Sequence, residues 1–144
     1  MLDIRPLNDR FAVAPQIDPQ DLPAIAAAGY VAVVNNRPDG EEPGQPDGAA
    51  IRAAAQAAGL AYHEAAVGPA GVSHALIDAM TAALTGADGP VLAYCRSGTR
   101  SCHLWALAAA RGGRNPDVLT AQAAAAGYDL SGLRPTLDAL ARGA

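Results

Sequence analysis

Short, uninterrupted apolar segments constrain the fold of this chain more than any other feature. The runs Tyr30–Asn35 (YVAVVN) and Val91–Tyr94 (VLAY) are apolar, without regular polar alternation. Such runs are typical of strands buried on both faces, as in parallel sheets covered by helices. Alanine-rich segments that end near glycines separate these runs and predict the covering helices. The sequence therefore predicts an α/β fold with a mostly parallel sheet flanked by helices.

The expected elements follow one another without an internal repeat or a dividing linker. The chain opens with a small hairpin, because Asn8-Asp9 between two apolar segments is typical of a turn. The expected strands cover residues 4–6, 11–14, 30–35, 60–65 and 91–94, and the expected helices cover residues 19–28, 49–58, 73–85, 101–111, 116–126 and 130–142. Gly and Pro residues predict loops at 36–48 and 67–72. A length of 144 residues predicts one domain over residues 1–144.

Charge and composition exclude several classes of function. All ten cationic residues are Arg and the formal net charge is −4, which argues against nonspecific binding to nucleic acid or to an anionic membrane. No apolar run reaches the ~18 residues of a membrane span, and the first residues show no export signal. The expected location is therefore the cytoplasm. Two cysteines, Cys95 and Cys102, are too few for a disulfide framework and are expected to be free thiols.

The chemistry is concentrated in residues 95–101 (CRSGTRS), which follow the buried strand 91–94 and precede a helix. The backbone N–H groups of such a loop, together with the helix N-terminus, form a cradle for an anion. Arg100 adds a planar guanidinium that holds two oxygens of an oxyanion. The same positive field favours the thiolate of Cys95, which is then a nucleophile.

Other residues of this loop, and of the loop 36–48, supply further candidates. Gly98 permits the backbone conformation that the loop requires, and Ser101 can donate a hydrogen bond to the thiolate. Residues expected to contact the bound anion are Arg96, Ser97, Gly98, Thr99 and Ser101. Arg37 is a candidate anion ligand and Asp39 a candidate acid. Alternatively, Asp39-Gly40 is an ordinary turn, and Glu41 and Glu42 are solvated.

The remaining candidates have simpler interpretations. Cys102 either packs in the core or resolves an oxidised Cys95, and Trp105 is expected in the core. His63, His74 and His103 have no second ligand at a diagnostic spacing. The sequence therefore predicts neither a metal site nor a cofactor.

The segment CRSGTR resembles two families of cysteine enzymes. Cysteine-dependent protein phosphatases use Cys-x5-Arg followed by Ser or Thr, whereas rhodaneses commonly use a six-residue loop of the type C-R-x-G-x-R. Four residues separate Cys95 from Arg100, which is the rhodanese length, and Tyr94 stands where phosphatases usually have His. The N-terminal half (FAVAPQIDPQDLPAIAAAGYVAVVNNRPDGEE) is similar to the opening of dual-specificity phosphatases.

Nearly the whole chain resembles the bacterial beta-lactamase-hydrolase-like, phosphatase-like family, whose members are also called family sulfurtransferases. The segments NNRPDGEEPGQP and AYCRSGTRS carry this resemblance. It implies a dual-specificity-phosphatase-like fold with Cys95 and Arg100 as catalytic residues. Members occur alone or fused to sulfur-oxidising enzymes, so the resemblance also implies a sulfur-oxidising enzyme as a candidate partner.

Three functions remain open at this point. The first is a sulfurtransferase, in which Cys95 takes sulfane sulfur from thiosulfate or a glutathione persulfide and passes it to a thiol, sulfite or cyanide. It is favoured because the loop 67–72 holds no acid where the resembled phosphatases carry an Asp for the leaving oxygen. The alternative is a phosphatase that forms a phosphoenzyme on Cys95 from a phosphate ester. The third is a noncatalytic anion-binding or redox-sensing module that uses Cys95 and Cys102.

Overall fold

The computed structural model describes residues 1–143 and is built around a five-stranded sheet in the order β1-β2-β5-β3-β4. The strands are β1 (Arg5–Asn8), β2 (Phe11–Ala14), β3 (Ala32–Asn35), β4 (Ala61–Glu64) and β5 (Val91–Tyr94). β1 pairs with β2 in an antiparallel hairpin, and every other pair of neighbours is parallel. The predicted mostly parallel sheet is therefore confirmed.

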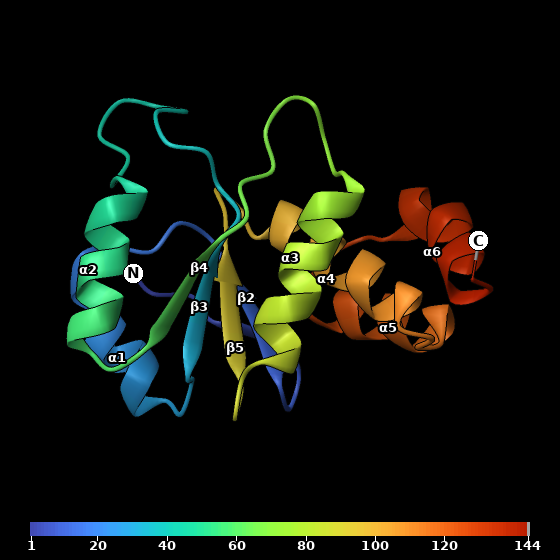
Figure 1. Ribbon diagram of the computed structural model, residues 1–144, viewed down its shortest axis with the longest axis horizontal. Helices are drawn as coiled ribbons and strands as arrows, with labels where there is room; N and C mark the ends of the chain where they lie inside the picture. The colour runs from blue at the N-terminus through green and yellow to red at the C-terminus, as the bar shows by residue number, and fades with distance from the viewer. Residues whose placement is uncertain (144) are drawn as a thin grey trace.

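Helices cover both faces of this sheet (Figure 1). On one face lie η1 (Pro19–Asp21), α1 (Leu22–Ala27) and α2 (Gly48–Ala57). The other face is covered by α3 (His74–Thr85), α4 (Thr99–Arg111), α5 (Pro116–Ala125), η2 (Ser131–Leu133) and α6 (Arg134–Ala141). No helix within residues 1–143 is long and apolar enough to cross a bilayer.

Three helices differ by two or more residues from their predicted bounds. The helix predicted from residue 19 is a 3-10 turn followed by α1, whose second residue is Pro23, because proline is tolerated only in the first turn of an α-helix. Pro135 is likewise the second residue of α6. The helix predicted from residue 130 is therefore a 3-10 turn, η2, followed by α6. In contrast, α4 begins at Thr99, two residues before the predicted start.

Successive residues of the central strands pack on opposite faces of the sheet. In β5, Val91 and Ala93 belong to the core beneath α3 and α4, whereas Leu92 and Tyr94 belong to the core beneath α1 and α2. This two-sided burial explains why the strand shows no polar alternation. Trp105 of α4 stacks on Phe11, with ring centroids 5.6 Å apart, and supplies bulk in an alanine-rich core as predicted.

The sheet order brings the ends of β3 and β5 together. β5 lies between β2 and β3, and Asn35 pairs with Tyr94 at the carboxyl edge of the sheet. The chain leaves β3 for α2 on one face and leaves β5 for α4 on the other. Open α/β sheets bind ligands at such a point, where successive connections diverge. The loops that start at residues 36 and 95 therefore lie at the edge where a site is expected.

Removing the Trp105 ring tests how far α4 depends on this contact. We expect Trp105→Ala to lower the free energy of unfolding by about 3–5 kcal/mol, because the large side chain leaves a cavity in a core of small residues. Urea denaturation measures this change. Val118→Ala is the control, since Val118 is 45% exposed and its loss should change stability by about 0.5 kcal/mol or less. A loss below about 1 kcal/mol for Trp105→Ala would contradict the expectation.

Candidate active site

Residues 95–98 form a turn that folds back on the sulfur of Cys95. Gly98 has φ +92°, in the left-handed region that favours glycine. Its N–H donates to Cys95 Sγ with an N···S distance of 3.1 Å. α4 begins at the next residue, so the N–H groups of its first turn, which have no partner within the helix, lie beside the sulfur. The loop therefore holds a buried sulfur in a field that favours negative charge.

Tyr128, between α5 and η2, supports this turn from the C-terminal part of the chain. Its hydroxyl donates to the carbonyl of Ser97 at 2.9 Å and accepts from Arg5 Nη1 at 3.3 Å. A Cβ atom at Gly98 would lie 2.2 Å from the Tyr128 hydroxyl, so only glycine fits there without a shift. Sequence reasoning missed Tyr128, because it lies 31 residues from Ser97 and belongs to no local motif.

The guanidinium of Arg100 is held by Glu41. Nη1 and Nη2 of Arg100 each donate to one carboxylate oxygen of Glu41 at 2.8 Å, and Nη1 also donates to the Val67 carbonyl at 2.9 Å. Within residues 1–143, these hydrogen bonds do not use two N–H groups of Arg100, Nε–H and one Nη2–H. Both lie on the same edge of the guanidinium. Two parallel N–H groups on one edge are the fork that binds an oxyanion. The hydrogen bond to Glu41 and the nearby Cys95 both raise the pKa of Arg100, so it remains charged.

All three side-chain nitrogens of Arg37 donate to neighbouring side chains. Its side chain is almost fully buried, and it donates to Glu41 at 2.8 Å, to Glu42 at 3.0 Å and to Gln16 at 3.0 Å. Burial opposes the charge of Arg37, but the hydrogen bonds to the two carboxylates more than offset it and raise its pKa. Arg37, the candidate anion ligand of the sequence, is thus placed to act through Glu41.

Glu41 bridges two arginines. The hydrogen bond from Arg100, and then that from Arg37, lower the pKa of Glu41 to about 2. The alternative of a solvated loop therefore does not hold for Glu41. No local motif indicates this role, because the Arg100–Glu41 pair joins residues 59 positions apart.

Two other residues that the sequence analysis proposed for the site, Asp39 and Arg96, make different contacts from those expected. Asp39, the candidate acid, accepts a hydrogen bond from the Gly48 N–H at 2.8 Å and so caps the start of α2. Arg96 projects outward with 69% of its side chain exposed, and its nearest acidic partner is Glu42 at 3.7 Å. Arg96 is therefore placed to attract an approaching anion rather than to hold a bound one.

The hydroxyl residues of the loop divide into outer and inner positions. Ser97 and Thr99 are exposed and bond to each other through their hydroxyl groups at 3.0 Å. Ser101 is fully buried, and within the described residues its hydroxyl has no hydrogen-bond partner. The expected hydrogen bond from Ser101 to Cys95 is not formed in this structure, where the Gly98 N–H occupies that role.

Cys102 lies in the hydrophobic core on α4. Burial, and then the charge of Cys95, raise the pKa of Cys102 to about 12, so its thiol stays protonated at neutral pH. A protonated, buried thiol is a poor nucleophile, which disfavours the resolving role considered above. Within residues 1–143, no three His, Cys, Asp or Glu side chains are grouped so that they could hold a metal ion.

The site combines a cysteine at the end of a central parallel strand with an N–H-lined turn, a helix N-terminus and a fixed arginine. This combination defines the class of cysteine-dependent phosphatase-like proteins. The family model described as "Beta-lactamase hydrolase-like protein, phosphatase-like domain" matches residues 3–112. The chain belongs to this family, as the sequence resemblance indicated.

Relatives and solved structures agree with this assignment. A beta-lactamase hydrolase-like protein of Xylella fastidiosa (strain Temecula1) is 40% identical over 125 residues, covering 86% of this chain and 29% of the relative. One from Agrobacterium fabrum is 40% identical over 108 residues, covering 75% of this chain and 25% of the relative. The chain thus spans less than a third of the length of these relatives.

Among solved structures, a candidate phosphatase of Neisseria meningitidis Z2491 superposes with a TM-score of 0.79 at 35% identity, covering 95% of this chain and 97% of that one. Tk-PTP in its active form has a TM-score of 0.73 at 15% identity, covering 96% of both chains, and shows the fold alone. The family model and the Neisseria structure favour the phosphatase alternative of the sequence analysis over its sulfurtransferase hypothesis.

The contact between Gly98 and Tyr128 predicts coupled effects on stability. We expect Gly98→Ala to lower the free energy of unfolding by about 1–3 kcal/mol, because it adds a strained backbone and a steric clash. In a Tyr128→Phe background the clashing hydroxyl is absent, so the same substitution should cost measurably less. A double-mutant cycle by urea denaturation measures the difference. Equal costs in both backgrounds would show that the hydroxyl does not restrict residue 98.

Glu41 predicts a pH-dependent contribution to stability. Its pKa in the folded chain, about 2, lies below the unfolded value of about 4.3. The stabilisation is therefore complete above about pH 5 and is lost as the pH falls toward 2. Glu41→Gln should lower the free energy of unfolding at pH 7 by about 1–2 kcal/mol, after allowance for solvent screening. Denaturation of both proteins between pH 7 and 2 should show the difference vanishing; a constant difference would contradict this role.

Proposed function

We propose that this chain is a cysteine-dependent phosphatase that hydrolyses phosphate monoesters through a phosphocysteine at Cys95. One observation carries the proposal: Glu41 occupies one edge of the Arg100 guanidinium and leaves the other edge available beside the sulfur. A phosphoryl group has enough oxygens to meet this fork and the N–H groups of the loop together.

The first step is binding of the ester with its phosphorus opposite Cys95 Sγ. The two N–H groups on the available edge of Arg100 hold two phosphoryl oxygens, and the N-terminal N–H groups of α4 stabilise the charge that builds on them. Glu41 and Val67 fix the guanidinium beforehand, so little reorganisation is needed when the ester binds.

The second step transfers the phosphoryl group to sulfur. The Cys95 thiolate forms an S–P bond while the P–O bond to the leaving group breaks, and the leaving oxygen keeps the bonding electron pair. That oxygen takes its proton from solvent, because the loop 67–72 holds no acid and Asp39 is engaged with Gly48. Water then attacks phosphorus, releases inorganic phosphate and restores the thiolate, while its surplus proton passes to solvent.

Sulfur transfer is the second candidate, supported by the four-residue spacing between Cys95 and Arg100 and by the acid-free loop 67–72. In this reaction the Cys95 thiolate attacks the outer sulfur of an anionic donor. A new S–S bond forms, the donor bond breaks, and sulfite or a thiolate departs with the electron pair without protonation. An acceptor thiol, sulfite or cyanide then removes the sulfur from Cys95.

A side-by-side assay separates the two reactions. The wild-type chain is incubated with p-nitrophenyl phosphate, with thiosulfate plus cyanide, and with glutathione persulfide plus sulfite. We expect phosphate release that is abolished in Cys95→Ser and retained in Cys102→Ser. Arg100→Lys should reduce kcat/KM at least about tenfold, because an ammonium cannot reproduce the two-pronged contact. Turnover of the sulfur donors alone, dependent on Cys95, would replace the phosphatase proposal with sulfur transfer.

A further inference from the structure

A chain of hydrogen bonds reaches the sulfur of Cys95 from outside the turn 95–98. Arg5 Nη1 donates to the Tyr128 hydroxyl at 3.3 Å, and this hydroxyl donates to the Ser97 carbonyl at 2.9 Å. The N–H of the same peptide group, that of Gly98, donates to Cys95 Sγ at 3.1 Å. Every donor in this chain points toward the sulfur, so the dipoles are aligned, with a cation at the far end. The proposed reaction gives no role to Arg5 or Tyr128.

The peptide group between Ser97 and Gly98 joins the two halves of this chain. A trans peptide is planar, so its C=O and N–H point in opposite directions, here toward Tyr128 and toward the sulfur. Glycine adopts positive and negative φ about equally well, so the backbone at Gly98 does not by itself prevent this peptide from turning over. A turned peptide would aim its carbonyl oxygen at the sulfur and would disfavour a thiolate. The hydrogen bond from Tyr128 favours the orientation in which the N–H meets the sulfur.

Tyr128 is suited to this role by its position and by its protonation state. The residue is buried, between α5 and η2, and packs in the core beneath the helices α3 to α6. Burial raises the pKa of Tyr128, although Arg5 partly opposes this shift. The hydroxyl therefore keeps its proton at neutral pH and remains a donor to Ser97. Tyr128 lies outside residues 3–112, which the family model matches, so the C-terminal helices contribute a contact to the site that the matched segment does not contain.

We propose that Tyr128 is a positioning residue for Cys95 and that, with Arg5 behind it, it holds the Gly98 N–H on the sulfur and so favours the thiolate. Aligned hydrogen bonds in a protein interior polarise one another, so a cation at one end strengthens the bond at the other. The proposal rests on the proposed function only in taking Cys95 as the reacting atom, and sulfur transfer uses the same thiolate. Loss of the Tyr128 hydroxyl leaves the sulfur in place but removes part of its preference for negative charge.

The pH dependence of Cys95 alkylation tests this role without requiring turnover. Iodoacetamide reacts with the thiolate, so its rate between about pH 5 and 10 reports the thiolate fraction. Trypsin separates the two cysteines, because Arg96 and Arg100 lie between them, and mass spectrometry then follows Cys95 alone. We expect Tyr128→Phe to move the midpoint of this profile upward by at least about half a pH unit, since the hydrogen bond to the sulfur is weakened. An unchanged midpoint would overturn the proposal.

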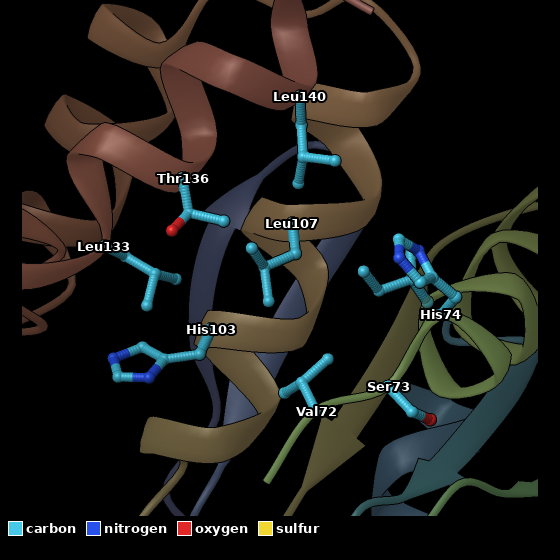
Figure 2. A pocket seen from close by; sticks show the side chains of 9 residues that line it. Val72, Ser73, His74, His103, Leu107, Leu133, Thr136 and Leu140 are labelled. Carbon is cyan, nitrogen blue, oxygen red and sulfur yellow. The ribbon is translucent and has the colours of Figure 1, made fainter. Parts of the chain in front are cut away.

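Two control variants separate positioning of the sulfur from a general loss of structure. Leu140 of α6 and Leu107 of α4 line a cavity of about 400 Å³ that shares no residue with the turn 95–98 (Figure 2). Leu140→Ala should lower stability, because it removes buried apolar contacts, but should leave the alkylation midpoint unchanged. Tyr30→Phe removes a hydroxyl just before the amino end of β3, away from the site, and should also leave the midpoint unchanged. A shift in either control as large as that in Tyr128→Phe would show a nonspecific effect and overturn the proposal.

Variants of Arg5 test the outer end of the chain and replace Tyr128→Phe if that variant does not fold. Arg5→Met should move the midpoint in the same direction by a smaller amount, because the hydroxyl then loses its donor. In a Tyr128→Phe background the chain is already broken, so Arg5→Met should add much less. An unchanged midpoint in Arg5→Met alone, or a full additional shift in the double variant, would overturn the proposed chain.

Failure of this proposal and failure of the proposed function give different results. If p-nitrophenyl phosphate is not hydrolysed but Tyr128→Phe moves the midpoint, the positioning role stands and the phosphatase proposal falls. If esters are hydrolysed through Cys95 but the midpoint is the same in Tyr128→Phe, only the positioning role falls. If both proposals are correct, the acidic limb of the hydrolysis profile should move with the alkylation midpoint.

Discussion

The ion-pair chain Arg37–Glu41–Arg100 is the interaction on which the geometry of the site depends. The Arg37 side chain is only 1% exposed, and an unpaired charge at such a position would cost several kcal/mol. The chain buries this charge by folding the loop after β3 so that Glu41 and Glu42 reach it. Glu41 then has oxygens left to bind Arg100. Burial of one arginine in the first half of the chain thereby orients another in the second half.

The order of the strands makes this ion-pair chain possible. The Asn36 N–H donates to the Tyr94 carbonyl at 2.9 Å, and the Val67 N–H donates to the Asn36 carbonyl at 2.9 Å. These bonds join the carboxyl ends of β3, β4 and β5, so three loops that are far apart in the sequence start side by side. Each loop contributes a different part: Glu41 from the first, the Val67 carbonyl from the second, and the sulfur from the third. A sheet in which β5 did not lie next to β3 could not bring all three together.

The sequence predicted the parts of this structure that are encoded locally. The apolar runs predicted the buried strands, and Cys95, Gly98 and Arg100 were identified from one segment because a turn and a helix N-terminus have local signatures. The contacts of Glu41 and Tyr128 were not predictable in this way, because both residues meet the loop only through the tertiary fold. The loop length of CRSGTR favoured sulfur transfer, whereas family and fold comparisons favour a phosphatase. Loop length alone does not identify the reacting atom, since both reactions need the same sulfur and the same fork.

The balance of charge around Cys95 limits how strongly the side chains of the site attract an anion. Arg37, Arg96 and Arg100 are paired with Glu41 and Glu42, so the five side chains together leave a single positive charge. A thiolate at Cys95 cancels it, so the formal charges of these side chains alone do not attract an approaching phosphate dianion. Glu41 thus orients Arg100 but lowers the positive charge available to hold the anion. Affinity must come from directed hydrogen bonds at the Arg100 edge and from contacts beyond the phosphoryl group.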